Sequence, residues 1–326
     1  MYRSQGGAAQ VRVIRRPYTP RDRLLDGRFN AILKLRADIP KNSYLFVWKG
    51  EPKEAKLSPL LNEVRGMLER GQIVQRYNDI VRRVEGYVKS RTPTRSREPP
   101  TRKGSPYIPA SSIKGAARSR LEYKFSKKTE DRPTSYACYV VQEGEVGERH
   151  RRFWGDEATL RREGPCSIED SEGGNVCVVC DIFGAPSLAA RLDFSDATLT
   201  SGGLEELRDM GITAFRPGSS FSLVCHGRNF NDAELGLFYL SLELFSGSPV
   251  IMGFRKYVHN PTTGYPYQGK YYFGLIRFTL DEVMTLTHDL GEKSVSSGQS
   301  LKQARAALDQ SEYHAYLDYD RGVIKL

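Results

Sequence analysis

The chain has 326 residues, of which 39% are hydrophobic and 27% charged, a composition that excludes a wholly disordered protein. Lysine and arginine outnumber aspartate and glutamate by 49 to 39, and the formal charge of +10 favours an anionic partner, with nucleic acid as the first expectation and better solubility as the alternative. No stretch approaches the roughly 18 apolar residues that a membrane span needs, and the N-terminus lacks the apolar segment of a signal peptide. We therefore expect a cytoplasmic protein without a membrane partner.

The first predicted elements are a basic arm, a strand, a helix and a loop. Residues 1–24 are basic and without pattern, whereas residues 29–36 alternate apolar and polar side chains, apart from Ile32, as in a sheet that helices cover on one face. Apolar residues at three- and four-residue steps predict a helix from Ser58 to Gly71. Residues 89–105 hold three prolines and six basic residues against one glutamate, which predicts a loop, either a solvated linker or a segment that follows a nucleic acid.

Helices and strands then alternate, with long insertions between them, as in an α+β fold. The periodicities predict a helix at residues 111–125, strands at 193–200 and 221–225, a helix after Asn231, a strand at 271–280 and a helix at 301–308. The helix after Asn231 has the clearest start, because Asn231 and Glu234 have the spacing of a capping box.

The strongest local signal is the sequence SSIKGAAR at residues 111–118. Free N–H groups at a helix start, the positive end of the helix dipole and the charge of Lys114 would meet at one place, which suits a phosphate. Gly115 leaves room for a second backbone, and Arg118 lies one turn further on, where it would reach a second phosphate or a base edge. The alternative is structural: Ser111 and Ser112 would only begin the helix, and Lys114 would point into solvent.

Three stretches resemble signatures of the RAMP superfamily, at residues 106–118 (PYIPASSIKGAAR), 180–197 (which contains FGAPSLAARLDFSD) and 247–257 (GSPVIMGFRKY). The first is similar to the family's YIPGSSLKGALR, with Ala110 in place of glycine. In the second, an FG turn precedes a strand that ends in Asp-Ala. The third resembles a degenerate form of the family's glycine-rich loop and is followed by Phe273-Gly274. The resemblance spans about residues 25–280.

This resemblance implies a ferredoxin-like, RRM-like α+β core at residues 25–290, with the basic loop at 89–105, a Cys/His insertion at 138–182, and a C-terminal helical tail at 291–326. It also implies a subunit of a type III CRISPR effector complex, which would stack along a guide RNA, meet target RNA and contact other RAMP subunits. The residues that would contact RNA are Ser111, Ser112, Lys114, Gly115, Arg118, Gly253, Phe254, Arg255, Lys256 and Tyr257. Phe254 and Tyr257 would stack on bases, or else pack in the core.

Cysteine spacing predicts a metal site. Cys177 and Cys180 form a CxxC pair typical of a zinc knuckle, and with Cys166 and His150 upstream they make a predicted set of four zinc ligands. Cys138 competes for the fourth position. The set is also similar to a Cys/His site ahead of the FG turn in some type III RAMP subunits. The alternative is that Cys177 and Cys180 are small buried apolar residues. Four protein ligands would leave no open position, so the site would be structural.

Catalysis is the less favoured interpretation. RAMP subunits that cut target RNA use an aspartate from a loop between the first strand and the YIP motif, and that interval here offers Asp38 and Asp79, without the family's usual surroundings. We predict a non-catalytic RNA-binding subunit, with a magnesium-dependent endoribonuclease that cleaves target RNA opposite the guide as the alternative. A third interpretation is an RNA-binding protein unrelated to CRISPR. Asp193 and Asp196 are expected to cap backbone donors or to pair with Arg191.

Overall fold

The fold is taken from a computed structural model, which describes residues 11–47, 50–51, 58–70, 77–82, 94–95, 97–126, 134–138, 148–160, 162–168, 174–262, 264–288 and 291–326. Part of the predicted basic arm, the predicted helix end at Gly71 and much of the 89–105 loop lie outside these residues.

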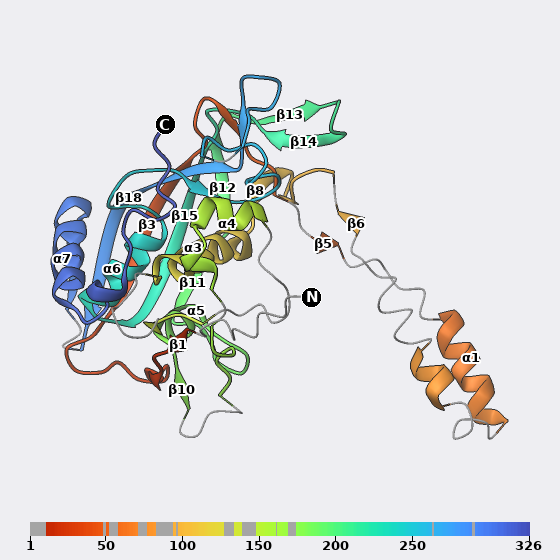
Figure 1. Ribbon diagram of the computed structural model, residues 1–326, viewed down its shortest axis with the longest axis horizontal. Coiled ribbons are helices and arrows are strands. Elements are labelled where there is room, and N and C mark those ends of the chain that lie inside the picture. Colours follow the sequence, from red (N-terminus) through yellow and green to blue (C-terminus); the bar gives the residue numbers. More distant parts are fainter. Residues whose placement is uncertain are drawn as a thin grey trace, which may run out of the picture.

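A large curved sheet forms the centre of the molecule (Figure 1). Within the described residues nine strands join it, in the order β16-β18-β3-β15-β12-β8-β7, while β11 pairs with β15 and β19 pairs with β18. All of these pairings are antiparallel. The strands are β3 (Phe29–Asp38), β7 (Thr101–Arg102), β8 (Ser105–Ile108), β11 (Leu192–Phe194), β12 (Ala197–Ser201), β15 (Ser220–Phe230), β16 (Val250–Ile251), β18 (Leu275–Thr287) and β19 (Glu292–Ser296).

Smaller strand pairs lie around this sheet. They are formed by β1 (Arg12–Val13) with β9 (Thr134–Ser135), β2 (Arg16–Pro17) with β10 (Asn175–Val176), β4 (Ser43–Tyr44) with β17 (Tyr272–Phe273), β5 (Gly50–Glu51) with β6 (Thr94–Arg95), and β13 (Leu204–Leu207) with β14 (Ile212–Phe215).

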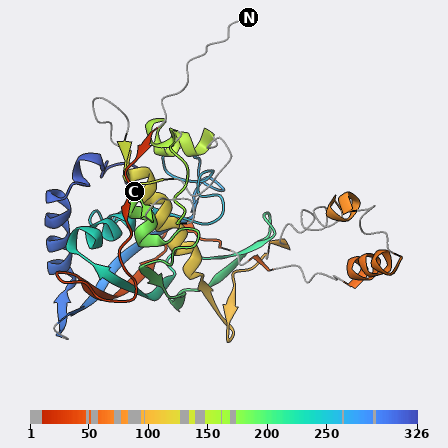
Figure 2. The same cartoon turned by 90° about the horizontal axis from the view of Figure 1, so that it is seen from below.

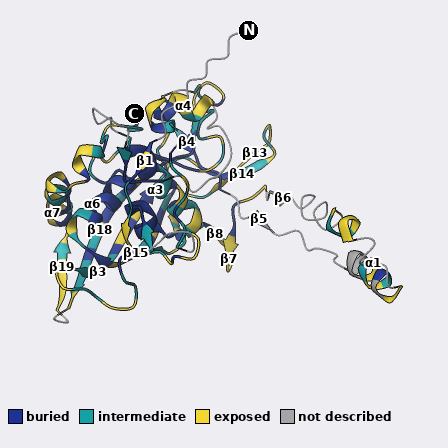
Figure 3. Cartoon of the chain, turned by 60° about the horizontal axis from the view of Figure 1, so that its bottom comes forward, coloured by how far each residue is buried: buried dark blue, intermediate teal, exposed yellow. Residues whose placement is uncertain are grey.

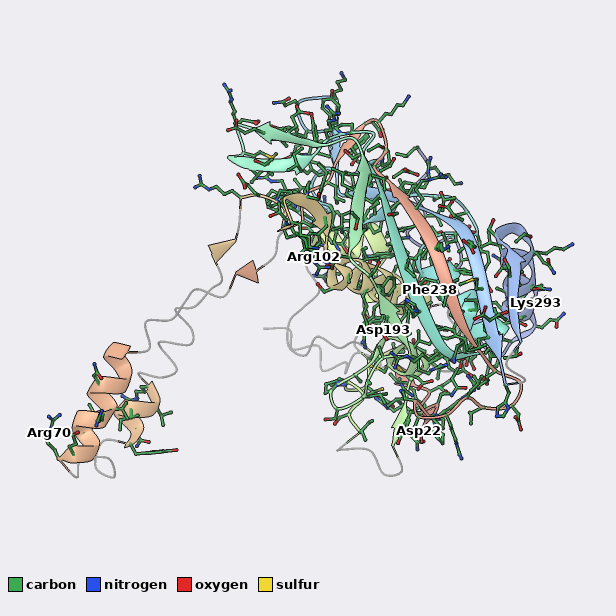
Figure 4. All side chains as sticks on the ribbon, turned by 180° about the vertical axis from the view of Figure 1, so that it is seen from behind. Asp22, Arg70, Arg102, Asp193, Phe238 and Lys293 are labelled. Carbon is green, nitrogen blue, oxygen red and sulfur yellow. The ribbon has the colours of Figure 1, made fainter. Side chains whose placement is uncertain are left out.

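Side-chain alternation gives the central strands one buried and one open face. On β3 the buried side chains are those of Ala31, Leu33, Leu35 and Ala37. Lys34 and Arg36 between them are exposed. On β15 Phe221, Leu223 and Cys225 are buried in the same way. Both alternations were predicted and are confirmed. Figure 4 shows β15, β3 and β18 from the open face, with the helices behind them.

Helices cover the buried face of the sheet, and their inward sides carry the core (Figure 3). The helices include α1 (Ser58–Glu69), which lies apart from the sheet, α3 (Ala110–Lys124), α4 (Glu148–Trp154), α5 (Val178–Phe183), α6 (Asp232–Ser241) and α7 (Ser297–Gln310), with 3-10 turns at Glu157–Thr159 and His314–Tyr316. The predicted capping box is confirmed, because the side chain of Asn231 accepts from Glu234 N at 2.9 Å and Asn231 N donates to the Glu234 carboxylate at 3.3 Å. Helix α7 is longer than predicted, since Ser296 caps it. Among the described residues, no helix combines the length and apolar character that crossing a bilayer requires.

Helices α6 and α7 approach each other closely at Gly236. A Cβ added there would lie 2.6 Å from Ala304 O, and that oxygen belongs to a helix backbone that cannot move alone. We therefore expect Gly236→Ala to lower the free energy of unfolding by about 1–3 kcal/mol in urea denaturation, although alanine favours helices. Gly115→Ala on α3 is the matched control, because nothing lies within 4 Å of its Cβ position. Equal stability of the two variants would contradict the close approach.

Two predicted strands are interrupted. The strand predicted at 193–200 is two strands, β11 and β12, both paired with β15. Between them, the Ser195 hydroxyl takes a place in the ladder by accepting from Val224 N at 2.9 Å, and Asp196 turns toward α3. The strand predicted at 271–280 breaks at Gly274, whose φ is +74°. A Cβ at Gly274 would lie 2.4 Å from Met252 O, so close backbone approach requires the glycine.

The predicted loop at 89–105 ends in a hairpin, which corrects that prediction for its last residues. Arg102 on β7 pairs with Ser105 on β8, across a two-residue turn. Both turn residues have positive φ, 50° at Lys103 and 80° at Gly104, as hairpins with the strand twist require. The X-Gly pair was the available sequence signal.

At the periphery two elements project from the sheet, whereas the last residues of the chain pack against α3. Figure 1 shows α1 apart from the sheet, and the β13–β14 hairpin at the opposite edge from α7. The last residues of the chain instead pack along α3, where Lys124 Nζ donates to Tyr319 O at 2.6 Å and Asp318 N donates to Lys124 O at 2.9 Å. Ile324 is buried.

Candidate functional site

Four cysteines from three segments meet beside α5. The Sγ atoms of Cys138, Cys166, Cys177 and Cys180 lie within 4.8 Å of one another, and all four residues are buried. The Cys138 Sγ lies 3.3 Å from that of Cys180 and 3.7 Å from that of Cys177, and no disulfide joins them. A tetrahedral ion with metal–sulfur bonds of about 2.3 Å holds its sulfur atoms roughly 3.8 Å apart. The cluster therefore has the dimensions of a four-thiolate metal site.

Backbone N–H groups point at these sulfur atoms. Cys138 N and Cys180 N each donate to Cys177 Sγ at 3.4 Å, and Cys177 N donates to Cys166 Sγ at 3.2 Å. Hydrogen bonds from the other three thiols, that of Cys138 first, lower the pKa of Cys166, whereas burial raises the pKa of Cys177. Buried thiols this close ionise together only with a cation between them. The donor set therefore fits a divalent metal.

The fourth member of the cluster is Cys138, and not His150 as first predicted. The ring of His150 instead lies 3.9 Å from that of Tyr257, centroid to centroid, and burial lowers the pKa of His150. Cys138 follows β9, 28 positions before Cys166, and that spacing carries no local signal. Cys138 was the alternative prediction for the fourth position, and only the tertiary fold brings it to the CxxC pair.

Arg118 belongs to the cysteine cluster rather than to an open RNA surface. Its Nη2 donates to Cys180 Sγ at 3.1 Å, its Nε donates to Glu122 at 2.9 Å, and its Nη1 contacts Gly184 O. The side chain is only 16% exposed. Because α5 and the FG turn cover this face of α3, the predicted contact of Arg118 with a second phosphate is not available in this arrangement. A guanidinium that donates to a sulfur atom would offset negative charge on the cluster once its thiols ionise.

The predicted phosphate site at the start of α3 is partly occupied by a carboxylate. Pro109 is the N-cap residue, and Asp196 Oδ1 accepts from Ala110 N at 2.9 Å, so Asp196 caps the helix as one of its predicted roles required. Arg102 pairs with Asp196 at 2.8 Å. Lys114 is half-buried, and its pKa is lowered by burial. Ser111 and Gly115 are exposed on the same turn, while Ser112 is half-buried.

The other predicted RNA-contact segment, residues 253–257, is a tight loop. Gly253 has a φ of +78°, and a Cβ there would lie 2.5 Å from Phe46 O. Arg255 is exposed and has a φ of +55°, which an arginine rarely adopts. Burial, followed by the nearby charge of Arg120, lowers the pKa of Lys256 to about 8. The loop is thus held in a specific conformation that exposes Arg255.

The two aromatic residues of this loop pack inward. The Phe254 ring meets the Phe46 ring edge to face at 5.9 Å. The Tyr257 hydroxyl accepts from Trp154 Nε1 at 3.0 Å, and its ring contacts Phe153 at 5.8 Å. Of the two interpretations left open, packing is the one that the described contacts favour for Tyr257. The partner, α4, lies in the Cys/His insertion, so no signal near Tyr257 indicated it.

The candidate catalytic aspartates lie far apart in the fold. Asp38 ends β3 and pairs with Arg36 at 3.3 Å. Asp79 is exposed, in residues 77–82, which follow α1. Asp193 pairs with Arg228 at 2.9 Å, whereas Arg191 pairs with Asp181 and Glu234, so the predicted pairing of Arg191 with Asp193 or Asp196 is wrong. The structure brings no two of these candidate carboxylates together.

The comparisons with known proteins show which family this chain belongs to. Curated proteins include no match. Among solved structures, one match is a crystal structure described as the Csm3-Csm4 subcomplex in the type III-A CRISPR-Cas interference complex. It covers 88% of this chain and 98% of that chain, at 13% sequence identity and a TM-score of 0.38, which is too weak to bear on fold or function. A family model described as the RAMP superfamily matches residues 47–296, well over half of the sequence, and the chain therefore belongs to the RAMP superfamily.

Proposed function

We propose that this RAMP protein is a cytoplasmic, guide-RNA-binding structural subunit of a type III CRISPR effector complex, with target RNA and other RAMP subunits as further partners. Three things support the proposal. The family match is long, the three motifs occur in family order, and the excess of basic residues favours an anionic partner.

The core is inferred to be ferredoxin-like. Its elements follow one another as β3, α3, β11 with β12, β15, α6 and β18, which is a βαββαβ order. The strands lie side by side as β18-β3-β15-β12, that is, fourth, first, third and second. RNA-binding domains of the RRM type share this arrangement.

Gly115 is the residue that carries the RNA-binding proposal. It lies inside α3, where glycine costs about 1 kcal/mol relative to alanine, yet its φ is not positive and nothing lies within 4 Å of its Cβ position. Neither the backbone conformation nor the packing of the fold therefore requires a glycine at position 115. A sugar-phosphate chain that approaches the helix backbone would require the absence of a side chain here. Lys114, which forms no ion pair with any described residue, supplies a positive charge beside it.

The four-cysteine cluster is proposed to bind one structural zinc ion through Cys138, Cys166, Cys177 and Cys180. Zinc would supply the positive charge that lets four buried thiols ionise. Because all four positions are protein ligands, the ion would tie the insertion to α3 and would not take part in chemistry. Cys177, as the N-cap residue of α5, fixes the turn on which Cys180 sits.

Binding of single-stranded guide RNA tests the proposed function. We expect Gly115→Gln to fold with wild-type stability but to bind RNA more weakly, because its side chain would fill the space where the sugar-phosphate chain passes. Lys114→Gln should lower the slope of log affinity against log salt by about 0.7, the value for one phosphate contact to a single strand. Filter binding across a salt series measures both, and thermal unfolding checks that the variants are folded.

Lys302→Gln is the matched control for Lys114, because Lys302 is exposed on α7 at the far end of the sheet. RNA binding that is unchanged in Gly115→Gln and Lys114→Gln would overturn this site. Cleavage of complementary RNA by the reconstituted complex with magnesium, lost in Asp38→Ala or Asp79→Ala, would replace the structural role with the endoribonuclease alternative.

A further inference from the structure

One long stretch of the sequence has no acidic residue. Between Glu243 and Asp281 the chain contains neither aspartate nor glutamate, while Arg255, Lys256 and Lys270 alternate with phenylalanine and tyrosine. Proteins that hold single-stranded nucleic acids combine basic side chains for the backbone with aromatic rings for the bases. The predicted RNA-contact loop at 253–257 forms only one part of this stretch, and the residues that follow the loop have no predicted role.

Helix α4 packs against this stretch. His150, Phe153 and Trp154 surround Tyr257, with a ring distance of 3.9 Å for His150 and a hydrogen bond of 3.0 Å from Trp154 Nε1. In Figure 2 the yellow-green helix α4 lies beside the blue chain of this stretch. Because these three side chains define its buried face, Arg149 and Arg151 lie on opposite flanks of the helix. Both arginines are exposed.

An exposed tyrosine follows the loop. Tyr265 is 63% exposed, although its backbone is fixed, because Tyr265 N donates to Val258 O at 3.3 Å. The Nδ1 of buried His259 lies 2.9 Å from Tyr265 O, and the two rings meet edge to face at 4.9 Å. Gly264 permits the turn, since a Cβ there would lie 2.3 Å from Val258 O. Nothing in the described packing of the core requires this ring to face solvent.

His259 contacts both the loop and the tyrosine. Its backbone N–H donates to Arg255 O at 3.0 Å. Burial is the first cause that lowers the pKa of His259, and the charges of Arg255 and Arg149 lower it further. Neither Arg149 nor Arg255 forms an ion pair with any carboxylate among the described residues. Arg152, on the solvent side of α4, pairs with Glu148 instead. Two guanidinium groups without a carboxylate partner among the described residues, one on the loop and one on α4, and an exposed aromatic ring together match one phosphate-base-phosphate unit of a single strand.

We propose that Arg149, Arg255 and Tyr265 form a second contact surface for single-stranded RNA, in which Tyr265 stacks on a base and the two arginines bind the adjoining phosphates. The proposal rests on the proposed RNA-binding function and extends it to the insertion, since α4 supplies Arg149. Arg118 and Tyr257, two residues expected from the motifs to contact RNA, are turned inward, and the new surface replaces them with side chains that are accessible.

The test compares variants of the full chain in filter binding with labelled single-stranded RNA over a salt series. Tyr265→Ala should weaken binding roughly 5- to 150-fold, the range for loss of one stacked base, whereas Tyr265→Phe should bind as the wild type does. Arg149→Gln should lower the salt slope by about 0.7. Arg151→Gln is the matched control, because it makes the same change two residues away on the other flank of α4.

The outcomes separate this inference from the proposed function. If the wild-type chain binds no RNA, the proposed function fails. If the wild type binds and Gly115→Gln weakens binding, while Tyr265→Ala and Arg149→Gln bind as the wild type does, only the second surface is overturned. An equal effect of Arg149→Gln and Arg151→Gln would also overturn it, since that result indicates general attraction by charge rather than a contact at the Arg149 flank.

Discussion

The purified chain is expected to contain about one equivalent of zinc, and Cys177→Ala to lose both the metal and much of the stability of the fold. Cys177 is fully buried, caps α5 and receives hydrogen bonds from Cys138 N and Cys180 N. Loss of a bound structural metal belongs to the few changes that cost more than about 4 kcal/mol. Elemental analysis measures the metal, and thermal unfolding with and without a chelator measures its contribution to stability.

Cys225→Ala is the matched control for the zinc prediction. Cys225 is also a fully buried free cysteine, but it lies on β15, outside the cluster. Its replacement removes one sulfur atom from the core and should cost about 1 kcal/mol without loss of metal. Wild-type protein that contains no zinc, and that unfolds at the same temperature with and without chelator, would show that the four cysteines are core packing.

Glu243→Gln should destabilise the fold by about 3–5 kcal/mol, because it removes the carboxylate that forms an ion pair with two buried cations. Glu243 Oε1 lies 2.9 Å from Arg120 Nη1 and 2.8 Å from Lys124 Nζ, and all three side chains are at most 2% exposed. The control is Glu282→Gln, which removes an exposed ion pair of similar length, 2.7 Å to Lys34 Nζ. That pair should contribute less than about 1 kcal/mol. Urea denaturation measures both variants.

The loss of stability in Glu243→Gln should also depend on pH. Burial already lowers the pKa of Lys124 below 10.5, and Glu243 opposes that shift, so the variant lowers the pKa further. A folded-state pKa below the unfolded one means that the unfolded chain binds more protons, and stability then rises with pH. The difference from the wild type should therefore shrink between neutral pH and about pH 9.5, although Arg120 remains charged. A difference that is constant over this range would contradict the role of Lys124.

Local patterns predicted those parts of the fold that depend on neighbouring residues. The alternation on β3 and β15 identified their buried faces correctly, because one face of the sheet meets helices and the other does not. The capping box at Asn231 needs only a four-residue segment, so it was equally readable. The CxxC pair likewise identified the cysteine cluster, since two of its members lie on one turn.

Tertiary packing decided the rest. Arg118 was expected to face RNA, but the face of α3 that it occupies is covered by α5, more than 60 positions away. Tyr257 lies under α4, an element from an insertion more than 100 positions upstream. Cys138 joins the cysteine cluster because its segment, distant in the sequence, packs against the CxxC pair. In each case a residue's role depends on which distant segment packs against it, and no local spacing contains that information.

The position of β3 in the sheet has a consequence for how the chain folds during synthesis. It lies between β15 and β18, and both of its partners come from the last third of the sequence. At about 5–20 residues per second, a ribosome that has made Asp38 needs on the order of 10–50 s more to reach the start of β18. For most of that interval both edges of β3 lack a partner strand, because β15 is made only toward its end, and the central sheet can close only near the end of translation.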